Sequence, residues 1–379
     1  MHIVIATAFD PIPSDGISVG RYYHLSMALK AHGHEVHFLT SRFSHASKTF
    51  RSEKEEETEG IKYTKVKSPG YTKNISLARL LDHFLLALQA KKTIAQIHAK
   101  KSIDLVLCAS PPLHWCNYIL KFCRKNKIKS VLDIQDNWPK AFEYLSPIAY
   151  QLSCNALPLQ LVRIHNITMA NAVTSVAAGY LPDTPNKTKA VFYLGAPVQE
   201  MQQNLSGIAG KGSDKLRLVY MGNISSHQPL LEFLNTNQHE NLQVTYIGTC
   251  EDERIKQHPL IQYKGSLYHE NLYQTLANND FGLFINDRYK EIKLPNKLFY
   301  YWACGLPVLG LDIEGESATL IQEMDGLILN NRHLKIPLLQ VHLSAINKER
   351  IKILASKKYD EKIIYPAFVT FLEQLVKQN

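Results

Sequence analysis

The sequence predicts an α/β fold made of two Rossmann-like domains that face a central cleft. Short apolar runs typical of buried parallel strands alternate with helical patterns along most of the chain. The alternation starts twice, at residues 2–8 and again at residues 217–221, and a loop that contains glycine follows each start. The 379 residues also give room for two domains of about 150 to 200 residues each.

The predicted domain boundary lies after residue 197. It divides the chain into an N-terminal domain at residues 1–197, a C-terminal domain at 198–364 and a final helix at 365–379. Residues 200–214 are polar, contain glycine and show little periodicity, which is typical of a connector. With 45% hydrophobic and 20% charged residues, the composition is that of an ordinary globular protein.

The chain is basic, with a formal net charge of +9 and a pI near 9.0. Such a balance favours anionic partners, which include nucleotide-sugars, acidic lipid surfaces and nucleic acid. No recognised nucleic-acid motif accompanies the charge, so we expect no nucleic-acid partner. A basic surface without a specific anionic partner is the alternative.

Cysteine usage and hydropathy predict a cytoplasmic protein. The six cysteines stand mostly in apolar contexts without a C-x-x-C pair, which indicates buried reduced thiols in place of disulfides or a zinc site. The opening residues MHIVIATAF have no basic leader and are typical of a first strand. No apolar run reaches about 18 residues, so we expect no membrane span.

The first βαβ unit is predicted to place a loop where open α/β sheets bind ligands. Residues 2–8 form its first strand, residues 21–32 a helix that Gly33 ends, and residues 35–40 its second strand. The loop between strand and helix contains Gly16, whose small size lets backbone N–H groups approach a phosphate or a sugar ring. Gly16 is therefore a candidate ligand-binding residue.

A charged segment and a long helix follow. Residues 51–59, RSEKEEETE, are predicted to be a solvated loop before a strand at residues 62–66. Residues 77–99 carry an amphipathic helical pattern, with lysines at positions 91, 92, 100 and 101. This helix either covers the sheet or rests with its basic face on a membrane that carries a lipid-linked acceptor.

The next strands lead to a candidate catalytic carboxylate. A strand at residues 104–109, a helix at 113–125 and a strand at 130–134 precede the sequence QDNWP. Asp136 follows the last of these strands directly, which is where a catalytic acid or base is expected to contact an acceptor hydroxyl. Asp133 is the second candidate, and a helix cap or a structural partner of Trp138 is the alternative role for Asp136.

The rest of the chain continues the alternation. Residues 148–172 are apolar and predicted to be helical, and residues 171–176 to be the last strand of the N-terminal domain. The C-terminal domain is predicted to contain strands at 217–221, 242–248, 261–264, 280–285 and 308–311 and helices at 229–235 and 272–278.

Residues 294–310, LPNKLFYYWACGLPVLG, form the most informative stretch. Pro295 suits the opening of a helix and Gly305 its left-handed end. Lys297 then lies in the first turn, where unpaired N–H groups and the helix dipole favour a diphosphate. Tyr300 and Tyr301, one turn on, are expected on the same side. The alternative is a solvated surface lysine beside a Tyr-Tyr-Trp core.

Two segments resemble one family. The pattern P-x-K-L-F-x-Y-x-A-x-G-x-P-V at residues 295–308 is similar to the nucleotide-sugar motif of family-four-like glycosyltransferases of the GT-B fold, in a subgroup that builds bacterial surface polysaccharides. The block from Ser110-Pro111-Pro112 to Asp136-x-Trp-Pro resembles the same subgroup. In relatives, the final helix crosses back to the first domain.

The resemblance implies roles for particular residues. Lys297 is expected to contact the donor diphosphate, and Tyr300 stands where relatives carry a ribose-binding glutamate, with Glu291 beside the position of a second one. The loop at Gly222 is similar to one that covers the donor phosphate, although His227 and Gln228 stand where relatives carry a basic residue. The full set of expected donor-binding residues is Gly16, Arg21, Gly222, Asn223, Glu291, Pro295, Asn296, Lys297 and Tyr300.

The predicted function is that of a glycosyltransferase without a metal or other cofactor, with Asp136 and Lys297 as catalytic residues. It would move a sugar from a nucleoside-diphosphate donor to a hydroxyl of a glycan or a lipid-linked glycan, and the resemblance implies retention at the sugar carbon. We expect it in the cytoplasm, with peripheral contact to the anionic inner face of the membrane.

Two other functions are compatible with the residues. Tyr300 in place of glutamate and the missing basic residue after Gly222 favour a catalytically weakened or inactive protein of the same fold that binds sugar-nucleotides as a partner or scaffold. A sugar-nucleotide epimerase shares the architecture but needs acid and base groups at the donor.

Overall fold

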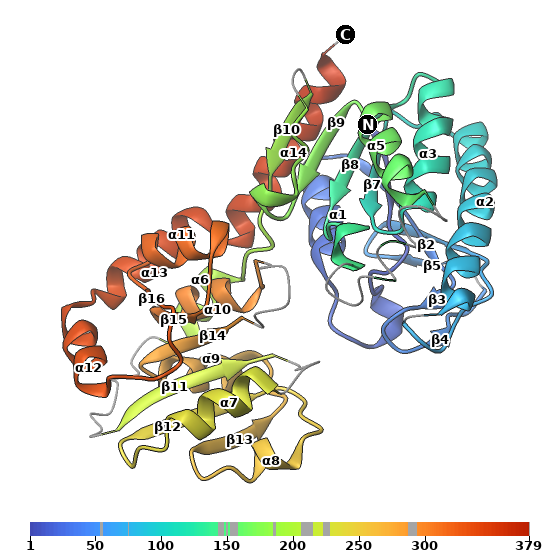
Figure 1. Cartoon of the computed structure of the whole chain (residues 1–379). Helices are drawn as coiled ribbons and strands as arrows, with labels where there is room; N and C mark the ends of the chain where they lie inside the picture. Colours follow the sequence, from blue (N-terminus) through green and yellow to red (C-terminus); the bar gives the residue numbers. More distant parts are fainter. Residues whose placement is uncertain are drawn as a thin grey trace. The chain divides into compact units, whose positions relative to one another are not determined.

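The computed structural model in Figure 1 describes residues 1–53, 56–74, 76–142, 148, 151, 158–184, 187–205, 215–222, 228–286 and 294–378. The chain divides into two compact units, the first made of Met1–Tyr193 with Tyr365–Asn379 and the second of Leu194–Ile364. Each unit has its own sheet of mainly parallel strands. The predicted α/β class with two Rossmann-like domains is thus confirmed, and the chain enters the second unit slightly before the expected position 198.

The first unit contains an eight-stranded sheet in the order β10-β9-β8-β7-β1-β2-β6-β5. Its strands are β1 (His2–Ala6), β2 (Glu35–Ser41), β5 (Glu56–Thr58), β6 (Ile61–Val66), β7 (Leu105–Ser110), β8 (Lys129–Ile134), β9 (Ala172–Ser175) and β10 (Thr188–Val191). Only the β5 and β6 pair among these is antiparallel. The chain runs outward from β1 on one side and from β7 on the other, so the strand order reverses between these two central strands.

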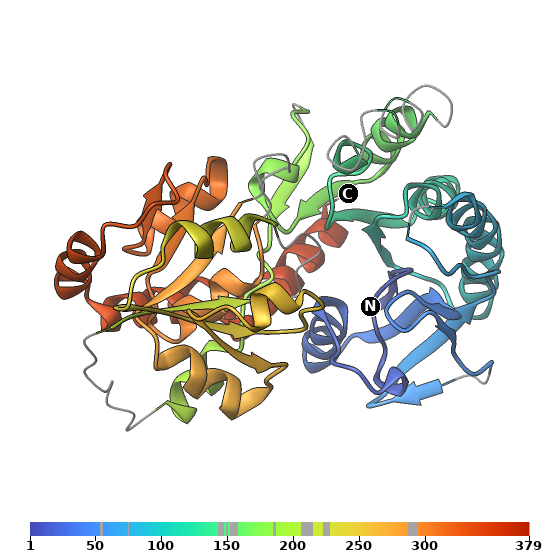
Figure 2. The same cartoon turned by 60° about the horizontal axis from the view of Figure 1, so that its bottom comes forward.

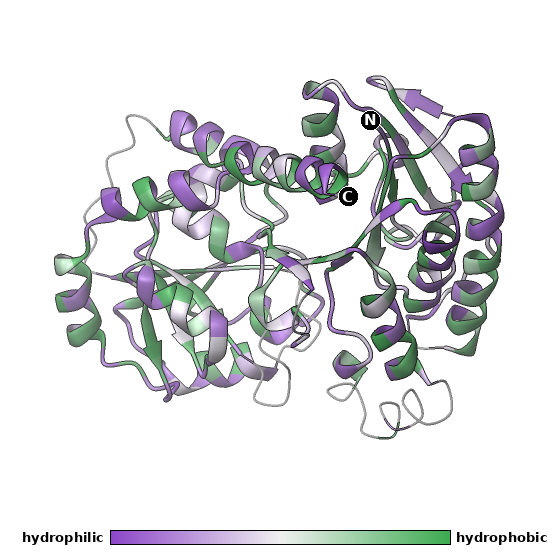
Figure 3. Ribbon diagram, turned by 90° about the horizontal axis from the view of Figure 1, so that it is seen from above, coloured by the Kyte–Doolittle hydropathy of each residue, from purple (hydrophilic) through white to green (hydrophobic). Residues whose placement is uncertain are grey.

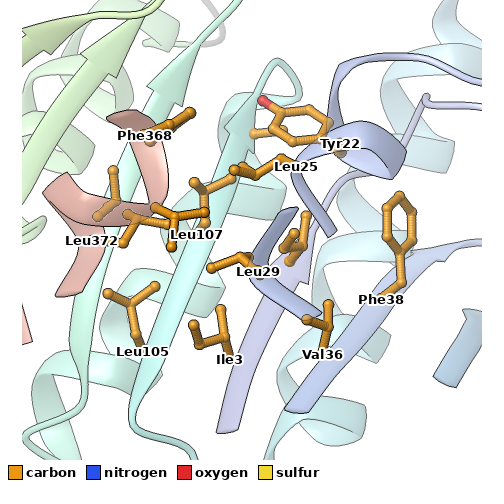
Figure 4. Packing of buried hydrophobic residues seen from close by; sticks show 14 of the residues in the cluster. Ile3, Tyr22, Leu25, Leu29, Val36, Phe38, Leu105, Leu107, Phe368 and Leu372 are labelled. Atoms are coloured by element: carbon orange, nitrogen blue, oxygen red, sulfur yellow. The ribbon is translucent and has the colours of Figure 1, made fainter. Parts of the chain in front are cut away.

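Helices cover both faces of the first sheet. In Figure 1, α2 (Leu77–Lys100), α3 (Leu113–Lys125) and α5 (Leu159–Met169) lie on one side, while α1 (Arg21–Ala31) and α14 (Glu361–Lys377) lie on the other. Figure 4 shows Leu25 of α1 and Phe368 of α14 packed over the strand residues Ile3 and Leu107. The last segment of the chain therefore completes the core of the first unit.

The second unit contains a six-stranded parallel sheet in the order β13-β12-β11-β14-β15-β16. The strands are β11 (Leu216–Met221), β12 (Leu242–Ile247), β13 (Ile261–Gly265), β14 (Phe281–Ile285), β15 (Val308–Leu311) and β16 (Leu327–Leu329). Its order reverses between β11 and β14, which are direct neighbours. Figure 2 shows this sheet with helices on both of its faces.

Two groups of helices enclose the second sheet. One core cluster joins the sheet to α7 (Gln228–Thr236), α8 (Glu253–Lys256) and α12 (Ile336–Ala345). The remaining helices of the unit are α6 (Val198–Asn204), α9 (His269–Ala277), α10 (Lys297–Ala303), α11 (Gly315–Glu323) and α13 (Lys348–Lys358). Among them, α10 packs against α6 and α13.

Helix α10 is fastened directly onto the two central strands. A Cβ at Gly282 of β14 would lie only 2.3 Å from a ring carbon of Tyr301, so a glycine is needed for this close approach. The Tyr301 hydroxyl accepts a hydrogen bond of 2.9 Å from the backbone N–H of Met221 in β11. Tyr301 thereby fixes α10 over the point where β11 and β14 meet.

Two sequence predictions about the fold were wrong. The charged run 51–59 is not a solvated loop, because Arg51 is buried and residues 56–58 form the edge strand β5. Strand β9 is not the last of its sheet, since β10 pairs with it. Most of the expected connector, residues 206–214, lies outside the described residues, while its first residues belong to helix α6, whose Val198 and Met201 are buried in the second unit. In each case packing against a distant element outweighs the local polar composition.

Other expectations about burial hold for the described residues. Cys108, Cys116, Cys123, Cys250 and Cys304 are all buried and are not in disulfides. Figure 3 shows hydrophilic and hydrophobic stretches mixed along the outer helices. In the part of the chain that the structure describes, none of the helices combines the length and apolar character needed to cross a membrane.

The contact between Gly282 and Tyr301 gives a stability prediction. We expect Gly282→Ala to lower the free energy of unfolding by about 1 to 3 kcal/mol, because the added methyl group forces the Tyr301 ring off the strand. Urea unfolding measures the loss. The matched control is Gly179→Ala, since no atom lies within 4 Å of a Cβ built there. Equal stability of both variants would contradict the packing argument.

Candidate active site

The carboxyl edge of the second sheet contains the candidate donor site. In open α/β sheets, ligands bind beyond the carboxyl ends of the strands at the point where the strand order reverses. Here that point lies between β11 and β14. Lys297, the first residue of α10, follows β14 along the chain and belongs to this edge.

The ammonium group of Lys297 lies over aromatic rings from both central strands. Its nitrogen is 4.1 Å from the ring centre of Tyr220 in β11 and 5.5 Å from that of Phe284 in β14. Attraction to the ring faces holds the cation there. Within the described parts of the chain, Lys297 makes no ion pair or hydrogen bond. The structure therefore presents an ammonium without an anionic partner at the reversal point.

Burial lowers the pKa of Lys297 to about 7, because the rings replace water around the charge. The residue as a whole is half-buried, so the desolvation applies to its charged end. A bound anion would favour the protonated form and raise this pKa again. A desolvated cation of this kind is well suited to hold a phosphate.

The two tyrosines of α10 take different positions. Tyr301 is fully buried beneath the strands, so the expectation that it lies on the ligand side with Lys297 was wrong. Tyr300 is half-buried, and burial together with the nearby carboxylates of Glu361 and Glu200 raises its pKa to about 12. Burial, with Asp360 and Glu200 close by, also raises the pKa of Glu361 to about 7.

This arrangement gives a physical reason for Tyr300 in place of glutamate. Glu200 opens α6 and Glu361 opens α14, so both carboxylates come from elements distant in sequence. A glutamate at position 300 would place another negative charge beside two carboxylates, and one of these already has a raised pKa. A phenol avoids the repulsion and can still hydrogen-bond a hydroxyl.

The other predicted donor residues are placed as follows. Gly222 directly follows β11 with φ of +140°, and no atom of the described residues lies within 4 Å of the place where a Cβ would stand. Pro295 and Asn296 precede α10, and Asn296 is exposed. Asn223, His227 and Glu291 lie outside the described residues. The Gly222 N–H donates to the Ile247 carbonyl at 2.9 Å, and the Gly222 carbonyl accepts from the Tyr246 hydroxyl at 3.1 Å.

The first unit has a second reversal point, between β1 and β7. The loop after β1 carries Gly16, which is exposed with φ of +67° and open space at its Cβ position. Arg51 holds the base of this loop through an ion pair of 2.6 Å to Asp15 and a hydrogen bond of 2.9 Å to the Asp10 carbonyl. The sequence around Arg51 did not indicate this role, because Arg51 is the first residue of a charged run.

Arg21 lies in the interior of the first unit. Its guanidinium donates to the Asp133 carboxylate at 3.1 Å and to the backbone carbonyls of Phe192 at 2.8 Å and Tyr193 at 3.2 Å. Asp133 also accepts from Thr174 at 2.6 Å and is completely buried. Donor binding by Arg21 stays a prediction, while the observed contacts are structural.

Two carboxylates lie at the carboxyl edge of the first sheet. Asp136 follows β8, is half-buried, and is near enough to Arg79 to favour the charged guanidinium. Sequence analysis missed Asp10, which follows β1. Burial raises the pKa of Asp10 to about 6, although Thr7 donates a hydrogen bond to it. A carboxylate that titrates near neutrality suits proton transfer, so Asp10 joins Asp136 as a candidate base.

Comparison with protein families adds one match. Residues 218–331 match the model of the Glucosyltransferase 3-like C-terminal domain. The match covers most of the second unit, including Gly222 and Lys297. A comparison with curated proteins finds no relative at a significant level.

Solved structures share the architecture over nearly the whole chain. An E. coli structure described as trehalose-6-phosphate bound with UDP-2-fluoro glucose has a TM-score of 0.63 at 11% identity, covering 100% of this chain and 99% of that one. HepE from Anabaena in complex with UDP has a TM-score of 0.61 at 11% identity, covering 98% and 99%. The trehalose 6-phosphate synthase of Burkholderia multivorans has 0.63 at 10%, covering 99% and 97%. These likenesses show that the chain has the GT-B fold.

The desolvation of Lys297 gives a prediction about stability. We expect Lys297→Met to raise the free energy of unfolding at neutral pH by about 1 to 3 kcal/mol, because the buried charge is removed while the packing on Tyr220 remains. The direction follows from the lowered pKa of Lys297 in the folded chain, which is about 7, whereas a lysine in the unfolded chain has a pKa of about 10.4. The unfolded chain therefore binds the proton of Lys297 more tightly, and at neutral pH this favours unfolding.

Urea unfolding at neutral pH measures this change. The control is Lys357→Met, because Lys357 is exposed in α13. A Lys297→Met protein less stable than the parent chain would mean that the ammonium stabilises the fold.

Proposed function

We propose that the chain is a glycosyltransferase that transfers a sugar from a nucleoside-diphosphate donor to an acceptor hydroxyl. The observation that carries the proposal is the desolvated ammonium of Lys297 at the reversal point of the second sheet, which forms no ion pair with any described residue. The match of residues 218–331 to a Glucosyltransferase 3-like domain supports it. So do the complexes of HepE with UDP and with UDP-glucose, which share the fold.

In the proposed reaction, the bond between the sugar carbon and the diphosphate oxygen breaks through an oxocarbenium-like state. Negative charge then grows on the departing diphosphate, and the ammonium of Lys297 stabilises it. The acceptor oxygen bonds to the sugar carbon, and its proton passes to a carboxylate, for which Asp136 and Asp10 are the candidates. Retention of configuration and independence from a metal are parts of this proposal.

Recognition of the ribose is proposed to involve Tyr300. Its phenol lies among the carboxylates of Glu200 and Glu361, which supply acceptors for ribose hydroxyls that a glutamate at position 300 would otherwise provide. The acidic character of this part of the donor site is thus kept, although the residues that supply it differ.

The alternative, a protein that binds the sugar-nucleotide without turnover, keeps the same donor site. The substitution at Tyr300 is the observation in its favour. Calorimetry with UDP, GDP and their sugars tests binding, and a donor hydrolysis assay then tests turnover. Binding of a donor without hydrolysis or transfer would support the scaffold function.

We further propose that helix α2 makes peripheral contact with an anionic membrane, as an enzyme of surface-polysaccharide synthesis with a lipid-linked acceptor requires. Its exposed apolar residues repeat at intervals of three and four and so share one face. They are Leu77, Leu81, Phe84 and Leu88, exposed by 84%, 56%, 41% and 39%. Lys91 and Lys92 extend this helix with positive charge.

The first functional prediction concerns turnover. We expect Lys297→Ala to keep the fold and to lower kcat by roughly two to three orders of magnitude, since removing one such charge donor costs about 2.7 to 4 kcal/mol of barrier. Transfer or hydrolysis of the donor measures the effect, and Lys357→Ala serves as a control. Unchanged turnover would remove Lys297 from the mechanism.

The second prediction concerns the pH dependence of UDP binding. Because Lys297 has a pKa of about 7 without a ligand and a bound diphosphate raises it, binding above this pH takes up a proton. The affinity should fall by up to about tenfold for each pH unit above 7. Calorimetry measures this slope, and Lys297→Arg should flatten it because its guanidinium stays charged. A slope unchanged in Lys297→Arg would assign the proton to another group.

The third prediction concerns the membrane. We expect the protein to float with vesicles that contain anionic lipid and not with neutral vesicles at physiological salt. Leu81→Gln with Phe84→Gln should reduce flotation several-fold, because less apolar area enters the interface. Ile353→Gln is the control, since Ile353 is equally exposed, by 48%, but lies in the second unit. Flotation that survives the double substitution would contradict a contact through α2.

A further inference from the structure

A cluster of rings and cations lies at the carboxyl edge of the first sheet, apart from the predicted donor residues. We call it the Tyr71 cluster. Its rings contact one another at centroid distances between 5.0 and 6.0 Å, and two cationic side chains lie over them. The members are Phe9, His45, Lys48, Tyr71, Arg79, His83 and Trp138.

Arg79 stands at the centre of the Tyr71 cluster. Its guanidinium carbon is 5.1 Å from the ring centre of Trp138 and 5.5 Å from those of Phe9 and Tyr71. Burial is the main reason why its pKa lies below the ordinary value. One of its N–H groups donates to the Asn74 carbonyl at 2.7 Å and another to His83 at 3.4 Å.

Lys48 brings a second positive charge to the same ring. Its nitrogen is 4.7 Å from the ring centre of Tyr71 and donates to the Asn74 side chain at 2.7 Å. Burial and the charge of Arg79 both lower the pKa of Lys48. Lys48 and Arg79 therefore hold two like charges against the ring of Tyr71, and these charges repel each other.

The cluster lacks a counterion in the part of the chain that the structure describes. Neither Arg79 nor Lys48 forms an ion pair there. Asp82, the buried carboxylate of the same helix, accepts from the Gly70 N–H at 2.7 Å, and burial raises its pKa. The charge of Asp136 also acts on Arg79 and favours its charged form. The positive charge of the cluster is thus only partly balanced.

The two histidines do not add charge at neutral pH. Burial and the neighbouring cations lower the pKa of His45 to about 4 and that of His83 to about 3. Both rings are therefore neutral hydrogen-bonding groups beside the cations. His45, which is half-buried, can form a hydrogen bond with a ligand that the cations attract, whereas His83 is buried.

The position of the cluster connects it to the proposed acceptor side. Phe9 follows β1 and precedes the carboxylate of Asp10, and Trp138 follows β8 two residues after Asp136. Two of the three rings around Arg79 thus come from the same loops as the candidate bases. Of these bases, Asp136 is near enough to act on the charge of Arg79.

We propose that the Tyr71 cluster binds an anionic group, a phosphate or a carboxylate, on the acceptor. This inference rests on the proposed glycosyltransferase function and adds to it the class of acceptor. The planar guanidinium of Arg79 suits bidentate contact with either group, Lys48 supplies a second charge-assisted hydrogen bond, and the half-buried rings of Phe9 and His45 can contact a sugar.

A purely structural role for Arg79, as a cation packed between rings, makes a different prediction. In that case, removing its charge changes stability and leaves the affinity for anions unchanged. Lys48 helps to separate the two roles, because it is half-buried at the surface and its removal should leave the fold intact.

The test measures anion binding directly, in the full chain with Lys297→Ala to remove the other anion site. Inorganic pyrophosphate represents the phosphate of a lipid-linked acceptor, glucuronate represents an acidic sugar, and glucose is the neutral control. We expect calorimetry to detect one of the two anions and not glucose. Arg79→Gln and Lys48→Gln should each weaken binding at least tenfold, whereas Lys125→Gln, at an exposed position, should not.

Each outcome decides the proposal. Binding of pyrophosphate alone assigns a phosphorylated acceptor, and binding of glucuronate alone assigns an acidic sugar. No binding of either anion, or equal binding by the Arg79→Gln and Lys48→Gln variants, overturns the proposal. A loss of stability in Arg79→Gln with intact anion binding in Lys48→Gln would leave only the structural role.

A kinetic readout separates this inference from the proposed function. In the chain with Lys297 intact, Arg79→Lys and Lys48→Gln should raise the KM for an acidic acceptor about tenfold while UDP affinity and donor hydrolysis stay the same. If the protein binds no nucleotide-sugar, the proposed function fails. If it binds the donor and the KM does not change, only the anionic acceptor is wrong.

Discussion

The ammonium of Lys297, held against the rings of Tyr220 and Phe284 without a counterion among the residues that the structure describes, is the constraint around which the second unit is arranged. Burial lowers its pKa to about 7, so the fold holds a charge that the surrounding rings solvate poorly. The side chain reaches this position only because β11 and β14 are neighbours and because Gly282 lets Tyr301 fix α10 onto them. The candidate donor site is thus a consequence of strand order.

Charged side chains occur in two different environments in the first unit. In the interior, Arg21 and Asp133 form an ion pair. Arg21 also donates to the Phe192 carbonyl and Asp133 accepts from Thr174, so both charged residues are part of the core. At the carboxyl edge, Arg79 and Lys48 share the Tyr71 ring and their charges are not neutralised by an ion pair within the described residues. Charges that form a buried ion pair hold parts of the fold together, whereas charges without an ion pair at a sheet edge attract a ligand.

The sequence around Tyr300 shows how a motif can change while its chemistry is kept. The expected glutamate is replaced, yet Glu200 and Glu361 place carboxylates near the same side chain from two other helices. Electrostatic repulsion explains why position 300 carries a phenol when positions 200 and 361 carry carboxylates. For this reason, the substitution alone does not show that the donor site has lost its acidic groups.

The sequence by itself determined the alternation of strands and helices, the two-domain α/β class, and the place of Lys297 at the start of a helix after a buried strand. These features follow from hydrophobic periodicity and from proline and glycine, which act over a few residues. Only the tertiary structure decided that Arg51 is buried, that Tyr301 lies under the strands, and that Arg79 gathers rings from three loops. Such contacts join residues far apart in the chain, and their stability comes from packing that local sequence does not encode.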